Sequence, residues 1–124
     1  MEFSITQAGG RSLADFANDI HAVLDSIAQT QRTTAVLQTE QGVMIVGGGA
    51  RDLTPAQRAL ADSLSLSPST LPGEYAEITV IQDSINRGLT PVELAVTRPI
   101  CDACATYIQS TGWKLTSPTT ASWR

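Results

Sequence analysis

The sequence is poor in the residues that build metal centres and disulfide frameworks, since its 124 residues include two cysteines and one histidine. A disulfide-stapled mini-protein uses more cysteines, spread along its chain, so this class is disfavoured. A closed structural zinc site needs four ligands, and His21 lies far from Cys101 and Cys104 in the sequence. The two cysteines form one CxxC motif, which is typical of a redox pair or of part of a metal site.

Basic residues and long apolar runs are also scarce. The chain has 8 Lys and Arg against 12 Asp and Glu, with a net charge of −4 and a pI near 4.7. Non-specific affinity for nucleic acids comes from clustered Lys and Arg, so a nucleic-acid substrate would need a few arginines to line one groove. No apolar run approaches the thickness of a bilayer, and no charged-then-apolar leader opens the sequence, so no membrane segment is predicted.

The composition indicates a single globular domain over residues 1–124, with 42% hydrophobic and 16% charged residues. Ser12 is the predicted N-cap of a first helix, whose apolar stripe runs from Leu13 to Ile27. The elements expected after it are a β-hairpin at 33–39 and 43–46, a short helix capped by Thr54, a Ser/Pro-rich connector at 65–72, a helix at 73–87, a strand at 92–97, a helix at 101–110, a strand at 113–116 and a polar tail at 117–124.

Strands that alternate with helices in the second half of the chain indicate crossover connections. The expected fold class is therefore α/β, with a mixed sheet of about four or five strands sandwiched by helices. Gly47–Gly49 ends the hairpin but lacks the Lys-Ser/Thr of a phosphate-binding P-loop. It is interpreted either as a flexible exit loop or as a loop that lets a substrate approach the backbone near Gly48.

Two segments carry residues suited to chemistry. Glu74–Glu77 lies at the start of one predicted helix, and Arg98–Cys104 leaves a predicted strand and enters the next helix. Cysteines three apart in a first helical turn can both face one ion, and the positive helix end favours their thiolates. Positions 75 and 77 are two apart across the other helix start, so one can face a metal while the other reaches a water on it.

Together these segments resemble the signature of the cytidine deaminase superfamily, which is H-x-E followed downstream by P-C-x-x-C. The resemblance implies a cytidine-deaminase-like fold and a Zn²⁺ site with Cys101 and Cys104 as ligands. Tyr75 occupies the position of the usual histidine, and Glu77 is implied to be the proton shuttle. In such a site zinc lowers the pKa of its bound water, which then attacks the ring carbon that bears the amino group.

More narrowly, Ala76–Val80 and Gly112–Trp123 are similar to the C-terminal deaminase domains of bacterial polymorphic toxins. This resemblance implies hydrolytic deamination of cytosine in single- or double-stranded DNA and a cognate immunity protein as partner. A monomer is expected, although no residue pattern determines the oligomeric state. The resemblance also implies secretion or delivery into the cytoplasm of a target bacterium, as the C-terminal part of a larger toxin. Deamination of RNA or of free nucleotides is the alternative. The expected substrate contacts are Ala76, Gly48, Arg98 and Pro99.

Tyr75 is the departure from the motif. A phenol is costly to ionise at neutral pH, and its oxygen lies further from the backbone than an imidazole nitrogen does. The substitution is therefore expected to weaken or abolish zinc binding and activity, unless the phenol or a water serves as the ligand. One C-to-T transition separates His from Tyr codons, so selection against a toxic gene would favour this change.

Other interpretations stay open from the sequence. Cys101–Cys104 could be a redox pair, although the Gly-Pro between the cysteines of thioredoxins is missing. Glu77 could be an ordinary carboxylate at a helix start. Arg51, Arg98 and Lys114 could contact phosphates or form solvated surface. A catalytically silent deaminase fold that an immunity protein recognises is the alternative to an enzyme.

Overall fold

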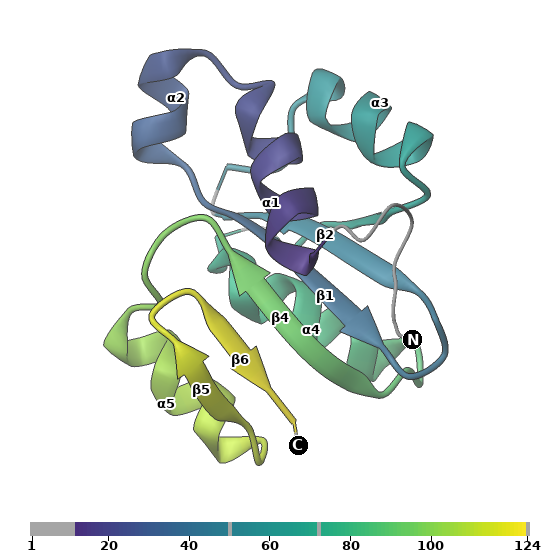
Figure 1. Cartoon of the computed structure of the whole chain (residues 1–124), viewed down its shortest axis with the longest axis vertical. Coiled ribbons are helices and arrows are strands. Elements are labelled where there is room, and N and C mark those ends of the chain that lie inside the picture. The colour runs from purple at the N-terminus through teal and green to yellow at the C-terminus, as the bar shows by residue number, and fades with distance from the viewer. Residues whose placement is uncertain (1–11, 50, 72, 124) are drawn as a thin grey trace.

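The structure, a computed structural model, describes residues 12–49, 51–71 and 73–123. Five helices and six strands follow one another along this part of the chain (Figure 1). In chain order they are α1 (Leu13–Ala22), α2 (Ser26–Gln31), β1 (Thr34–Thr39), β2 (Met44–Gly48), α3 (Pro55–Ser63), β3 (Ser67–Ser69), α4 (Ala76–Asn86), β4 (Pro91–Val96), α5 (Asp102–Ser110), β5 (Lys114–Ser117) and β6 (Thr120–Ser122).

The strands form one mixed sheet in the order β3-β2-β1-β4-β6-β5 (Figure 1). β1 pairs antiparallel with β2 and β4, and β6 pairs antiparallel with β4 and β5. β2 and β3 are parallel. The predicted α/β class, with a mixed sheet sandwiched by helices, is thus confirmed, although the sheet has six strands rather than four or five.

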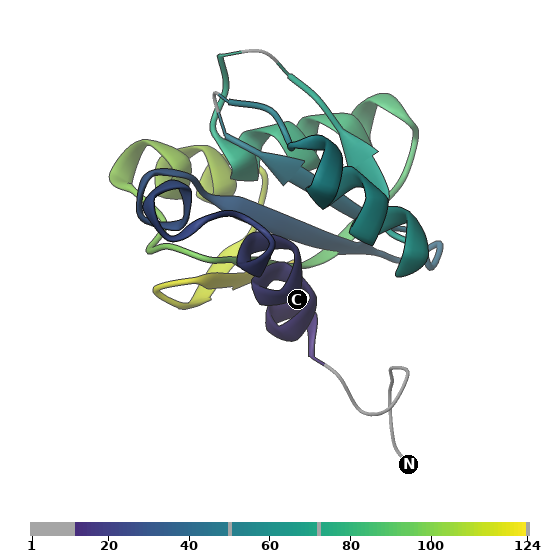
Figure 2. The ribbon, with the colours of Figure 1, turned by 90° about the horizontal axis from the view of Figure 1, so that it is seen from above.

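The central strand β1 alternates its side chains between two hydrophobic cores, as a pleated strand must. Leu37 belongs to the core covered by α4 and α5, and Val36 belongs to the core covered by α1 and α3. Both side chains are fully buried. Seen from above, the helices lie on both sides of the sheet (Figure 2). The two segments expected to carry chemistry, at the starts of α4 and α5, therefore share one face.

Two predicted helix starts have complete capping boxes. The Ser12 hydroxyl accepts the backbone N–H of Asp15, and the Asp15 carboxylate accepts the backbone N–H of Ser12. Thr54 and Gln57 make the same reciprocal pair at α3, where Pro55 is the first helical residue. These bonds satisfy N–H groups that a helix start otherwise leaves open, which explains why the sequence placed both starts correctly.

Two short strands correct the sequence prediction. β3 lies inside the segment predicted as a connector, and β6 lies inside the segment predicted as a polar tail. β6 enters the sheet between β4 and β5, and its Ala121 is fully buried. Each strand has three residues, mostly Ser, Thr and Pro, which is too short and too polar to show a period of two.

The first helix is also shorter than its apolar stripe predicts. α1 ends at Ala22, and α2 begins after Asp25, whose carboxylate accepts the backbone N–H of Ala28 at 2.8 Å. This second cap starts a new helix, so Ile27, at the end of the predicted stripe, is 68% exposed. The local hydrogen bond of the Asp25 side chain therefore ends the first helix and starts a second one, although the apolar spacing continues.

Gly47 in β2 allows α4 to pack close to the sheet. A Cβ added there would lie 2.9 Å from Cγ1 of Val80 and 3.1 Å from Cγ2 of Thr79. Gly47→Ala is expected to lower the free energy of unfolding by about 1–3 kcal/mol through overpacking, measured by urea denaturation. Gly49→Ala is the matched control, because a Cβ there meets no described atom within 4 Å. Equal destabilisation by the two variants would contradict this account of the packing.

Candidate functional site at two helix ends

The N-termini of two neighbouring helices bring the two chemistry-bearing segments together. Tyr75 is the N-cap residue of α4 and Cys101 that of α5, and neither side chain caps its own helix. The Tyr107 hydroxyl of α5 donates to Oε1 of Gln82 in α4 at 3.3 Å, which ties the helices to each other. The first-turn N–H groups of both helices therefore receive no hydrogen bond acceptor from the N-cap side chains. The partial positive charge at both helix ends favours acidic groups nearby.

Glu77, Cys101 and Cys104 form what we call the helix-end cluster. Glu77 is 4% exposed and Cys104 is fully buried, whereas Cys101 is exposed. Burial raises the pKa of Glu77, and the neighbouring Cys104 thiol offsets part of that rise. Burial, followed by the negative charge of Glu77 and the Cys101 thiol, raises the pKa of Cys104 above its usual range. A buried acid and a buried thiol therefore adjoin, and each favours its neutral form.

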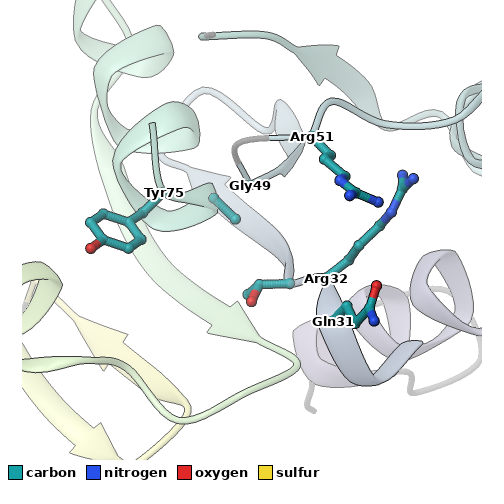
Figure 3. Close-up of a pocket in the computed structure, with 7 residues that line it drawn as sticks. Gln31, Arg32, Gly49, Arg51 and Tyr75 are labelled. Atoms are coloured by element: carbon teal, nitrogen blue, oxygen red, sulfur yellow. The ribbon is translucent and has the colours of Figure 1, made fainter. Parts of the chain in front are cut away.

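Tyr75 is held by its backbone rather than by its ring. Its carbonyl oxygen accepts both the backbone N–H and the hydroxyl of Thr79, each at 2.9 Å. The side chain is 52% exposed, and Figure 3 shows the ring directed away from the arginines of the neighbouring pocket. The residue at the predicted ligand position is thus anchored beside the helix-end cluster while its phenol lies toward solvent.

A pocket of about 370 Å³ opens beside the start of α4 (Figure 3). Its walls come from the connection between α2 and β1, from the residues after β2, and from the start of α4. Thr34 of β1 pairs with Gly48 of β2, so residues just before β1 and just after β2 meet at one edge of the sheet. The lining residues are Gln31, Arg32, Thr33, Gly49, Arg51, Tyr75 and Ala76.

The predicted substrate contacts lie in different places. Ala76 lines the pocket. Gly48 is buried, and its neighbour Gly49 lines the pocket instead. A Cβ on Gly48 would lie 3.0 Å from a backbone oxygen of the following turn, so this glycine allows close packing. Arg98 and Pro99 are exposed and do not line the pocket.

Arg32 and Arg51 are the cationic residues of the pocket wall. The sequence points to Arg51 as one of several candidate phosphate contacts, but it gives no reason to select Arg32. The hairpin register supplies that reason, because one arginine precedes β1 and the other follows β2 at the same edge of the sheet. Pairing the two predicted strands in register could therefore have found this pair.

His21 is engaged in the fold rather than in the helix-end cluster. Its Nε2 lies 2.9 Å from the carbonyl oxygen of Gln29, and its Nδ1 lies 3.0 Å from Oγ1 of Thr34. A carbonyl oxygen only accepts, so Nε2 carries the proton. The ring joins α1 to α2 and β1 on the face of the sheet opposite α4 and α5. The chain's one histidine therefore does not supply a third ligand beside the cysteines.

The donors of the helix-end cluster make part of a zinc site. Two thiols in one helical turn suit zinc, and the remaining ligand of the deaminase pattern would come from position 75. Among residues 12–49, 51–71 and 73–123, no three His, Cys, Asp or Glu side chains are grouped as a metal site requires. With the Tyr75 phenol toward solvent, the residues as they stand do not fit a complete three-ligand zinc site.

Comparison with known proteins assigns no family, since no protein-family model, no curated protein and no solved structure matches the chain. None of the helices in the described part of the chain is both long and apolar enough to cross a membrane. The structure itself defines a class of site: an α/β domain with a buried acid and thiol at two helix ends, beside an open pocket with two arginines.

Proposed function

We propose that this chain is a deaminase-type hydrolase domain for cytosine in DNA, in which Tyr75 attenuates activity. The observation that carries the proposal is the burial of Glu77 against Cys104 at the ends of two neighbouring helices. Ala76, the residue before Glu77, lines the pocket, whereas Glu77 itself does not, so the pocket opens one residue away from this buried carboxyl group.

The burial of Glu77 argues against a purely structural role. A carboxylate at a helix start is stabilised by the helix dipole, and it can have this role while it stays exposed to solvent. At 4% exposure the group loses its solvation, and no described cation contributes to its electrostatic environment. Such a group lowers stability unless it is neutral, and groups of this kind cluster at functional sites.

Glu77, Ala76 and the two cysteines would have different roles in the proposed reaction. Glu77 accepts a proton from the attacking water as its oxygen bonds to the ring carbon, and returns it to the amino group, which leaves as ammonia when the C–N bond breaks. Burial raises the pKa of Glu77, which suits a group that takes up and returns a proton. Ala76 offers a small wall to the base. Cys101 and Cys104 are retained zinc donors that lack their third partner. Because the donor set is incomplete, activity of the chain as it stands is expected to be low.

The attenuation is consistent with a toxin domain kept without its antidote. We propose that the domain is the C-terminal part of a larger toxin that is delivered into rival bacteria. A cognate immunity protein would then be the partner of the intact, active form. A chain that has lost its ligand histidine can be maintained in a cell without that protein.

Sequencing DNA from cells that express the Tyr75→His form tests the proposal. C-to-T changes are expected to accumulate, and the bases beside them would report the sequence preference. Cells that express Tyr75→His together with Glu77→Gln provide the background. Equal mutation frequencies in both cultures would overturn cytosine in DNA as the substrate, and uracil formation in purified RNA or nucleotides would then identify the alternative substrates.

A catalytically silent binding module is the second candidate, favoured by the exposed Tyr75 ring and the incomplete donor set. In that case the useful surface would be the one that an immunity protein recognises. The two candidates differ in the response to reversion. A silent module would bind no zinc and form no uracil even as the Tyr75→His form, whereas an attenuated enzyme would gain both properties.

A further inference from the structure

We propose that the pocket beside α4 is a phosphate site, in which Arg32 and Arg51 hold a phosphate group of the substrate. The ligand would be a nucleotide or a nucleic-acid strand rather than a free base or nucleoside. This inference rests on the proposed function for the identity of the base at Ala76 and Glu77. The phosphate site itself is carried by the arginines.

Arg32 has a hydrogen-bond donor without a partner. Its Nε atom is buried, and no described group accepts a hydrogen bond from it. Its Nη1 makes only a long contact of 3.5 Å with the carbonyl oxygen of Asp52. A buried donor left unsatisfied costs about 1–3 kcal/mol, so a side chain in this state needs an explanation. Arg32 lines the pocket, so a turn of its side chain toward an anionic oxygen there would give the guanidinium group the acceptor that Nε lacks.

Arg51 precedes Asp52, whose carboxylate holds the backbone after β2 in place. The Asp52 carboxylate accepts the backbone N–H of Leu53 at 2.7 Å, the hydroxyl of Thr70 at 3.1 Å and the guanidinium of Arg58. Asp52 thus neutralises Arg58 and holds the turn in place. Within the described residues, no carboxylate forms an ion pair with Arg51 or with Arg32.

The two guanidinium groups lie on the same side of the pocket, away from Tyr75 (Figure 3). Like charges on one wall repel each other, and an anion that contacts both offsets the repulsion. Guanidinium groups match phosphate oxygens by paired hydrogen bonds, which makes arginine the usual residue for this task. The volume of about 370 Å³ lies in the range of small-molecule sites and suits one nucleotide.

The placement also accounts for a nucleic-acid substrate in an acidic protein. The net charge of −4 opposes binding to polyanions in general. Two arginines on one wall, neither of them paired with a carboxylate of the described residues, give a local positive field that the net charge conceals. The phosphate would then lie at the arginine end of the pocket, and the base toward Tyr75 and the start of α4.

Fluorescence anisotropy of a labelled single-stranded oligodeoxycytidylate, titrated with the chain as it stands, tests the phosphate site. Arg32→Ala and Arg51→Ala are each expected to weaken binding about tenfold, as loss of a charge-assisted hydrogen bond does. Each should also reduce the slope of log affinity against log salt by about 0.7, the value per phosphate contact for single strands. Arg87→Ala is the matched control, since it removes an arginine that pairs with Asp83 at the other end of α4.

Competition separates the sources of the phosphate. Unlabelled dCMP that displaces the probe, where deoxycytidine at the same concentration does not, indicates that a monophosphate suffices. Displacement by an unlabelled oligonucleotide alone indicates a phosphodiester. Arg32→Lys, which keeps the charge, is expected to restore part of the binding, and a thermal melt of each variant separates lost binding from lost folding.

The proposal is overturned if Arg87→Ala weakens binding as much as the pocket variants do, or if deoxycytidine competes as well as dCMP. Binding is measured without catalysis, so absence of deamination in the Tyr75→His form would leave a positive result intact. Conversely, the Tyr75→His form could be active while Arg32→Ala and Arg51→Ala leave its affinity for the oligonucleotide unchanged. That result would reject the phosphate site but not the proposed deaminase function.

Discussion

Replacing Tyr75 by His is expected to raise the affinity of this chain for zinc by at least about a hundredfold, because loss of even an outer partner of a zinc ligand costs 10–100-fold. Imidazole binds zinc as a neutral group, whereas a phenol must first lose its proton. The backbone at position 75 is already fixed by its two hydrogen bonds from Thr79. A histidine there would start from an anchored Cα beside Cys101 and Cys104.

Competition for zinc with a coloured chelator, under reducing conditions at neutral pH, measures this affinity. Tyr75→Phe tests the phenol itself, and it is expected to leave zinc binding at the parent level. Ile85→His is the matched control, because it adds a histidine to an exposed position of α4 outside the helix-end cluster. Cys104→Ser in the Tyr75→His background should abolish the gain.

The attenuation hypothesis fails if Tyr75→His binds zinc no better than Ile85→His. A loss of zinc in Tyr75→Phe would instead identify the phenol as a working ligand. In that case the ring would have to turn from its exposed position toward the cysteines. Tyr75 also lines the arginine pocket, but that pocket contributes no Cys, His or carboxylate, so the change in zinc affinity itself reports on the helix-end cluster.

The elements that the sequence predicts correctly are those with strong local signals. The capping boxes of Ser12 and Thr54 and the β-branched hairpin fix their elements through residues within a few positions of one another. The pairing of Glu77 with the CxxC segment is expected from the resemblance to deaminases, and both segments do start helices. The structure adds that Glu77 and Cys104 are buried together.

The parts that the sequence does not predict depend on contacts between distant segments. β6 becomes a strand because β4 and β5 offer it hydrogen-bonding edges, not because Thr120–Ser122 has a strong preference of its own. The pocket likewise needs the ends of β1 and β2 to meet the start of α4. Arg32 is a candidate ligand residue because its Nε is buried without a hydrogen-bond acceptor among the described residues, and this burial depends on how distant segments pack.

Replacing Glu77 by Gln is expected to lower activity of the Tyr75→His form by about 10²–10⁴-fold, the usual contribution of a positioned acid or base. The variant keeps the size of the side chain but cannot exchange the proton. Initial rates of uracil formation measure the loss. Glu93→Gln is the control, since it removes an exposed carboxylate on β4 and should leave the rate unchanged. A similar loss of rate in both variants would show that Glu77 is not the proton shuttle of the reaction.

The same substitution is expected to stabilise the metal-free fold in a pH-dependent way. Burial raises the pKa of Glu77 above its ordinary value of 4.5, so the folded chain keeps a proton that the unfolded chain releases. Stability of the parent therefore falls as pH rises from about 4.5 through the folded pKa, and Gln removes this fall. With a chelator present, the gain in melting temperature should be small near pH 4.5 and grow toward neutrality. A residue whose removal stabilises the fold and stops the reaction is kept for chemistry, whereas a gain independent of pH would point to packing alone.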